Sequence, residues 1–155
     1  MSDQKKLAII ATKGSLDWAY PPFILASTAA ALGYETQIFF TFYGLQLLRK
    51  KLHLEVTPLG NPGMPMPMGM DKWFPVLGTA LPGMQSMMTA MMKKKMKDKG
   101  VASIEELREL CQEAEVKLIA CQMTVDLFDM NPAEFIDGVE YAGAAAFFEF
   151  AGESD

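Results

Sequence analysis

Short apolar runs alternate with longer amphipathic stretches, and this alternation predicts the elements of the fold. Residues 7–11 and 116–120 are continuous aliphatic runs flanked by polar residues, which is typical of buried strands. Residues 35–40 form a third run, after a segment, 17–32, whose apolar residues fall on two adjoining helical faces. A last strand is expected at 139–142. Strands that alternate with helices over short links predict an α/β domain with a parallel sheet.

Capping signals mark the predicted helices. Ser103 and Glu106 form a capping box before a helix over 103–114, and Gly33 suits the position that follows a helix end. The apolar stripe of the 103–114 helix contains Ile104, Leu107, Leu110, Cys111 and Ala114. Thr41 is a candidate cap for a helix over 45–51. Pro21 and Pro22 are expected in the first turn of their helix or before it, because proline lacks the amide hydrogen.

Two weaker patterns follow in the middle of the chain. Residues 55–59 predict a short edge strand, which brings the expected number of strands to about five. Residues 60–82 are rich in methionine and proline and have no helical period, which indicates an extended loop. Met84, Met87, Met88, Met91 and Met92 then recur at helical spacing. We interpret residues 60–97 as a Met/Pro-rich insertion within one domain that covers residues 1–155.

The methionines allow three interpretations. Adaptable packing against the core or a second subunit is the plainest, and docking of a partner on a soft surface is another. The alternating methionines at 64, 66, 68 and 70 also permit copper(I) binding, which is the least favoured because such patterns are usual in exported carriers.

Composition narrows the classes of function. The net charge of -5 argues against nucleic acid as a partner, and the longest apolar stretch, 21–32, is too short for stable membrane insertion. No export signal is evident, which favours a cytoplasmic protein with two free thiols. One histidine and two cysteines predict no metal site, and no G-x-G-x-x-G motif follows residues 7–11, so no cofactor is expected.

Cys121 is the candidate reactive residue. It lies between a predicted strand and a predicted helix, at the edge where open α/β sheets bind their ligands and where helix N-terminal amides favour a thiolate. The alternative is a small buried hydrophobic residue, the usual fate of a free cysteine and our interpretation of Cys111. The candidate pocket residues at the same edge are Thr12, Lys13, Gly14, Phe42, Tyr43, Gln122, Met123 and Thr124.

Four segments resemble the DsrE/DsrF family of sulfur-relay proteins, most closely its DsrE2/DsrE3-like branch. They are 39–45 with the sequence FFTFYGL, 91–97 with MMKKKMK, 120–128 with ACQMTVDLF, and 136–143 with IDGVEYAG, and the likeness covers nearly the whole chain. The resemblance implies a flavodoxin-like three-layer fold in a homo-oligomer, such as a trimer, tetramer or hexamer. It also implies that Cys121 carries sulfane sulfur as a persulfide and passes it to a partner thiol, such as that of a TusA-like protein.

The expected function is therefore a cytoplasmic sulfurtransferase or sulfur carrier that needs no cofactor. Two other classes stay open. One is an oligomeric binding module for a small anion or a partner protein, in which Cys121 is only part of the core. The other is a copper(I)-binding protein that uses the methionine-rich loop.

Overall fold

The structure is a computed structural model and describes residues 4–56 and 82–154. The described chain divides into two compact units. The first contains residues 4–14, 18–52 and 103–154, and the second contains residues 15–17, 53–56 and 82–102. The predicted Met/Pro-rich loop lies for the most part outside the described residues.

A parallel sheet of four strands forms the centre of the first unit. The strands are β1 (Lys6–Ala11), β2 (Glu35–Phe40), β3 (Lys117–Cys121) and β4 (Glu140–Ala142), and their order in the sheet is β1-β2-β3-β4. Each neighbouring pair is parallel. All four carboxyl ends therefore lie along one edge, and the register pairs Ala11 with Phe40, Phe40 with Ala120, and Cys121 with Ala142.

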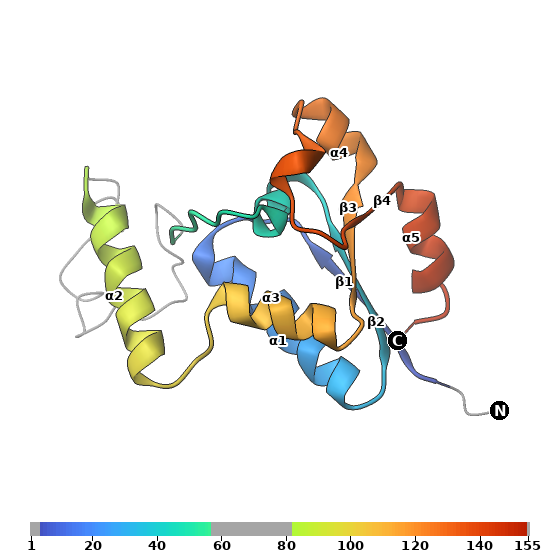
Figure 1. Cartoon of the computed structure of the whole chain (residues 1–155), viewed down its shortest axis with the longest axis horizontal. Helices are drawn as coiled ribbons and strands as arrows, with labels where there is room; N and C mark the ends of the chain where they lie inside the picture. Colours follow the sequence, from blue (N-terminus) through green and yellow to red (C-terminus); the bar gives the residue numbers. More distant parts are fainter. Residues whose placement is uncertain (1–3, 57–81, 155) are drawn as a thin grey trace. The chain divides into compact units, whose positions relative to one another are not determined.

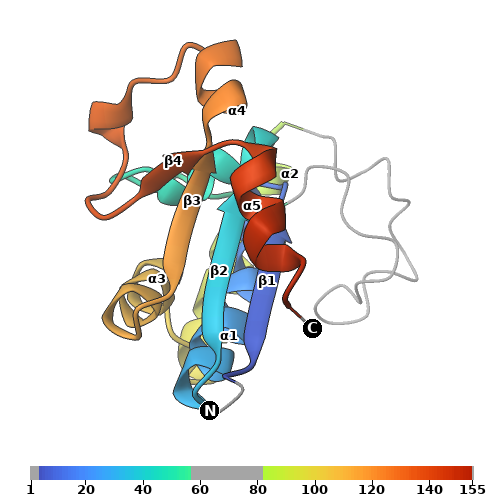
Figure 2. The same cartoon turned by 90° about the vertical axis from the view of Figure 1, so that its right-hand side faces the viewer.

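Helices cover both faces of this sheet (Figures 1 and 2). On one face lie α1 (Leu16–Ala31) and α3 (Ile104–Glu113), where the rings of Phe23 and Phe40 pack 5.9 Å apart. On the other face lies α5 (Ala144–Ala151), where Phe147 stacks on Phe39 at 4.9 Å. The expected α/β architecture with a mostly parallel sheet is confirmed.

Several local predictions are also confirmed. The Ser103 amide donates to Glu106 Oε2 at 2.9 Å and the Glu106 amide donates to Ser103 Oγ at 3.2 Å, which is the predicted capping box. Gly33 follows α1 with a φ of +88°, a conformation that favours glycine. Helix α4 (Gln122–Leu127) follows β3 directly, as expected.

Other predictions were wrong. Helix α1 begins at Leu16 and runs through Pro21 and Pro22, which therefore lie past its first turn. In place of a helix over 45–51, a 3-10 helix, η1 (Phe42–Leu48), begins directly after Thr41, and the Thr41 side chain does not cap it. Glu55 and Val56 are not in a strand, and the rest of the predicted 55–59 strand lies outside the described residues.

The stripe of α3 also differs from its pattern. Leu110 and Ala114 are exposed, and Arg108 is buried in addition to Ile104, Leu107 and Cys111. Arg108 Nη1 donates to the carbonyl groups of Leu47 at 2.9 Å and Arg49 at 2.8 Å. Its guanidinium therefore satisfies carbonyl groups at the end of η1, which explains a buried arginine on this face.

The second unit contains α2 (Met84–Asp98), which confirms the helix predicted from the methionine spacing. The Val56 amide donates to the buried Thr89 Oγ1 at 3.0 Å, and Gln85 Nε2 donates to the Val56 carbonyl at 3.0 Å. These two bonds hold residue 56 against α2. No helix among the described residues combines the length and the apolar character that a membrane span needs.

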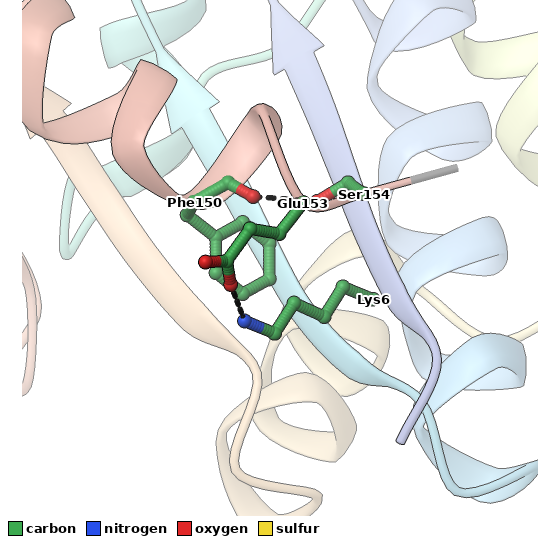
Figure 3. A network of polar contacts seen from close by, with 4 residues as sticks. All are labelled: Lys6, Phe150, Glu153 and Ser154. Carbon is green, nitrogen blue, oxygen red and sulfur yellow. Dashed lines mark hydrogen bonds and ion pairs between the residues drawn. The ribbon is translucent and has the colours of Figure 1, made fainter. Parts of the chain in front are cut away.

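The two ends of the first unit meet across the outer strand β1. The Lys6 ammonium pairs with the Glu153 carboxylate and lies 5.6 Å from the centre of the Phe150 ring (Figure 3). Ser154 Oγ donates to the Phe150 carbonyl at 2.9 Å, which closes the end of α5. These contacts fix α5 over β1 and so help to cover the face of the sheet on which Cys121 packs.

Candidate functional site

Two connections meet at the carboxyl edge of the sheet, and their backbones are in close contact. The Thr41 amide donates to the Ala11 carbonyl at 3.0 Å, which joins the ends of β1 and β2. A Cβ atom at Gly44 would overlap this same Ala11 carbonyl group, and one at Gly14 would overlap the Tyr43 carbonyl oxygen. Both positions therefore require glycine, and the loops after β1 and β2 form one packed layer.

Cys121 is the last residue of β3, and its side chain lies on the face covered by α5. It packs in a cluster with Phe39, Ile119 and Phe147, against the partly buried Ala142. Its exposed fraction is 4%. Because Cys121 pairs with Ala142 and α5 begins at Ala144, the thiol lies near the start of α5 as well as the start of α4.

Polar groups that favour a thiolate lie near the Cys121 sulfur. Burial raises the pKa of this thiol, but the nearby Thr124 hydroxyl, Thr124 amide, Thr41 hydroxyl and Met123 amide together lower it by more than burial raises it. The net pKa is below the ordinary value for cysteine. The thiolate fraction at neutral pH is therefore larger than for a free cysteine, and it is the thiolate that acts as a nucleophile.

Thr124 connects the sulfur to the end of β2. Its side chain is fully buried, and its Oγ1 lies 3.2 Å from Thr41 Oγ1. The Phe42 amide donates to the same Thr124 oxygen at 3.3 Å. Phe42 has a φ of +49°, a left-handed conformation that costs a residue with a side chain roughly 1–2 kcal/mol. The surrounding structure thus holds Phe42 in a strained conformation, with its amide on Thr124.

Large exposed side chains lie at this edge, and we call this group of side chains the aromatic collar. The Phe128 ring lies 6.1 Å from that of Phe42, edge to face, and 6.0 Å from that of Tyr43, stacked. The collar consists of Phe42, Tyr43, Met123, Leu127 and Phe128, all of them exposed. Exposed apolar side chains that gather beside a reactive group are typical of an interaction surface.

The structure brings only some of the predicted pocket residues to the sulfur. The hydroxyl and amide of Thr124 and the amide of Met123 lie near it and lower its pKa, and the Phe42 amide bonds Thr124. Gln122 Nε2 instead donates to Asp126 Oδ1 at 2.8 Å.

The residues after β1 lie elsewhere along the same edge. Lys13 Nζ lies 3.6 Å from the centre of the Trp18 ring, Gly14 packs on the Tyr43 carbonyl, and Thr12 is exposed. The positive charge of Lys13 thus lies over an indole ring.

Two residues of the site were missed by sequence reasoning. The pattern placed Thr41 only as a helix cap and Phe128 only on a helix face, whereas Thr41 lies near the sulfur and bonds Thr124, and Phe128 lies at the centre of the collar. In the sequence, the only sign that two hydroxyl groups meet is a threonine after β2 and another threonine after β3. This sign can be interpreted only once β2 and β3 are known to be neighbours.

Cys111 is also a buried free thiol, but its pKa shifts in the opposite direction from that of Cys121. It is fully buried in α3, and its Sγ donates to the Phe23 carbonyl at 3.5 Å. Burial raises the pKa of its thiol to about 11. A thiol of this kind stays protonated at neutral pH, so Cys111 has the structural role that the sequence predicted.

Fold and site together define an α/β protein with one activated thiol at the carboxyl edge of a parallel sheet. The model of the DsrE/DsrF/DrsH-like family matches residues 3–155, and this chain belongs to that family. The resemblance read from the sequence is thereby confirmed.

Similar proteins support the assignment. The chain is 92% identical over 153 residues to the sulfur carrier protein DsrE2 of Allochromatium vinosum, covering 99% of this chain and 96% of that one. It is 36% identical to the uncharacterised protein YrkE of Bacillus subtilis, with the same coverage of both chains. The crystal structure of the ychN protein from E. coli has the same fold, with a TM-score of 0.54 at 12% identity over 98% of this chain and 96% of that one.

Proposed function

We propose that this protein is a sulfur carrier that holds sulfane sulfur as a persulfide on Cys121. The observation that carries the proposal is the position of Cys121 at the carboxyl end of β3, beside hydroxyl and amide groups that lower the pKa of its thiol and so favour the thiolate. The name of the 92% identical relative, a sulfur carrier protein, supports the same function.

The proposed reaction has two balanced steps. In loading, the Cys121 thiolate attacks the outer sulfur of a donor persulfide, a new S–S bond forms, and the donor leaves as its thiolate. In unloading, the thiolate of an acceptor attacks the outer sulfur now on Cys121. The bond from that sulfur to Cys121 Sγ then breaks, and Cys121 is released as a thiolate. Neither step needs a cofactor or an external oxidant.

Intact-mass spectrometry tests the proposal directly. The protein is incubated with polysulfide and compared with a Cys121→Ser variant, with a Cys111→Ser variant as the matched control. We expect one or more added sulfur masses on the wild type and on Cys111→Ser, all removed by reductant, and none on Cys121→Ser. A wild type that takes up no sulfur while its Cys121 remains alkylatable would overturn the proposal.

We further propose that the aromatic collar receives the partner that exchanges sulfur with Cys121. Cys121 has an exposed fraction of 4%, so a partner must dock closely to reach its sulfur, and the collar offers exposed aromatic side chains on the connections that follow β2 and β3. A protein that presents a cysteine among apolar side chains, such as a TusA-like carrier, has the required chemistry.

One observation favours a second function. The low exposure of Cys121 also fits a core cysteine in a non-catalytic binding module. Alkylation of the native protein separates the two functions, because a reactive Cys121 is labelled within the native state whereas a core thiol is labelled only after unfolding.

The homo-oligomer implied by the family resemblance stays a prediction. Met87 of α2 is exposed and its neighbour Met88 is half-buried, so this helix offers a methionine surface for packing. If α2 forms the interface, aspartate at both positions dissociates the oligomer. An unchanged particle size by light scattering would contradict this.

A further inference from the structure

The hydroxyl groups of Thr41 and Thr124 share a limited number of protons, and this limit determines what each can do. A threonine hydroxyl donates one hydrogen bond and accepts two. The Phe42 amide can only donate, so it occupies one acceptor position of Thr124 Oγ1 at 3.3 Å. The Thr41 hydroxyl lies 3.2 Å from the same oxygen, where either group could donate.

Burial decides the direction of the bond between the two threonines. Thr124 is fully buried, whereas Thr41 is partly exposed to solvent. If Thr41 donates to Thr124, both acceptor positions of the buried oxygen are filled and its own proton is free for the Cys121 sulfur. If the direction is reversed, Thr124 keeps an unfilled acceptor position away from water. The first arrangement satisfies every polar position of the buried group, and Thr41 can complete its bonding with solvent.

We propose that Thr124 is a positioning residue that stabilises Cys121 Sγ as the leaving group when sulfur is transferred to an acceptor. Its hydroxyl oxygen accepts hydrogen bonds from Phe42 and Thr41, and its hydroxyl group donates a hydrogen bond to Cys121 Sγ. This inference rests on the proposed function. During unloading the electron pair of the breaking S–S bond stays on Sγ, where the fixed donor meets it. The donor is in place before the reaction, so no reorganisation is needed at that moment.

Such a hydrogen bond acts in opposite directions on the two steps. A thiolate that is stabilised leaves faster but attacks more slowly, with a Brønsted coefficient of about 0.5 for attack. The donor therefore favours unloading over loading, at any pH where Cys121 is fully ionised. A residue with only a structural role would slow both steps together.

Thr124→Val, with Thr124→Ser as the conservative variant, tests the proposal. Alkylation rate against pH gives the titration midpoint of Cys121, and intact mass gives the rates of loading from polysulfide and unloading onto dithiothreitol. For Thr124→Val we expect a titration midpoint of Cys121 about one pH unit higher than in the wild type. At a pH below both midpoints, this means a thiolate fraction about tenfold smaller. Well above both midpoints, we expect loading roughly threefold faster and unloading roughly threefold slower. Thr124→Ser should behave like the wild type.

Two further variants serve as controls. Thr36 is also a buried threonine of this sheet, with its hydroxyl on the Tyr34 carbonyl at 3.3 Å, and Thr36→Val should leave the midpoint of Cys121 unchanged. Thr41→Val should shift the midpoint less than Thr124→Val does, because Thr124 keeps its proton for the sulfur. Circular dichroism confirms that each variant is folded before its rates are compared.

The outcomes distinguish the inference from the function beneath it. A wild type that loads sulfur and a folded Thr124→Val that matches it in midpoint and in both rates would overturn the inference alone. Equal slowing of both steps, or a larger midpoint shift in Thr41→Val than in Thr124→Val, would also overturn it. A wild type that takes up no sulfur would overturn the proposed function, while the alkylation midpoints would still report the hydrogen bond.

Discussion

Gly44 of η1 lies directly against the carbonyl group of Ala11, with no room for a Cβ atom between them. The contact joins backbone to backbone, so no side chain can rotate away to relieve an overlap. It fixes the start of η1, and with it Thr41 and Phe42, relative to the end of β1.

Alanine at Gly44 should therefore destabilise the protein. We expect a loss of about 3 kcal/mol, the upper part of the range for overpacking, because the backbone must move. Chemical denaturation measures the change. Gly143→Ala is the matched control: a Cβ there meets nothing within 4 Å and its φ is −90°, so we expect a change within about 0.5 kcal/mol. Equal stability of the two variants would contradict the assigned contact.

Arg108→Met should also destabilise the protein, because it leaves the carbonyl groups of Leu47 and Arg49 without their donor. Unsatisfied buried acceptors cost about 1–3 kcal/mol each, so for two carbonyl groups we expect a loss of about 2–6 kcal/mol in urea denaturation. Arg49→Met is the matched control. It removes a single ion pair, with Glu134 at 3.7 Å between partly exposed side chains, and should cost about 1 kcal/mol or less.

Cys111 should make stability fall at alkaline pH. Burial raises the pKa of its thiol to about 11 from 9.0, so the unfolded chain loses this proton at a lower pH than the folded chain does. The contribution to stability is complete below pH 9 and is lost as the pH rises towards 11. Two pKa units correspond to about 2–3 kcal/mol.

The difference between wild type and Cys111→Ala isolates this contribution from lysines and tyrosines that titrate in the same range. The wild type should lose more stability than Cys111→Ala between pH 9 and pH 11, as measured by denaturant unfolding at each pH. Parallel curves for the two proteins would contradict the raised pKa.

The aromatic collar should matter to protein partners and not to small thiols. Phe128→Ser removes the ring that contacts both Phe42 and Tyr43. If the collar docks the acceptor, unloading onto a TusA-like protein should slow about tenfold or more, since such anchor residues contribute over 1 kcal/mol. Unloading onto dithiothreitol should not change. The control is Leu110→Ser, which removes an exposed apolar side chain from α3, and it should affect neither acceptor.

The sequence predicted the features that depend on neighbouring residues. An aliphatic run that ends in Cys121 before a helical pattern placed the thiol correctly, and Ser103 with Glu106 located the start of α3. Each of these signals is contained within a few consecutive residues. Reading them needs no knowledge of which strands are neighbours.

Features that depend on tertiary contacts were not predictable. The spacing of Leu110 places it on the apolar stripe, yet Arg108 takes a buried position because the carbonyl groups of η1 lie there. Likewise, η1 begins at Phe42 because Gly44 and Gly14 allow the loops after β1 and β2 to touch. No local pattern records which backbone another backbone meets.

The bond between Thr41 and Thr124 spans 83 positions of the chain, and it exists only where β3 has paired with β2. During synthesis, β1, α1 and β2 are complete long before residue 124 is made. Until β3 docks, Cys121 lacks the nearby Thr41 hydroxyl, and Thr124 lacks its hydrogen bonds to Thr41 and Phe42. Its reactivity therefore reports assembly of the sheet. A chain in which β2 and β3 have not paired therefore holds a Cys121 thiol whose pKa is lowered by fewer groups.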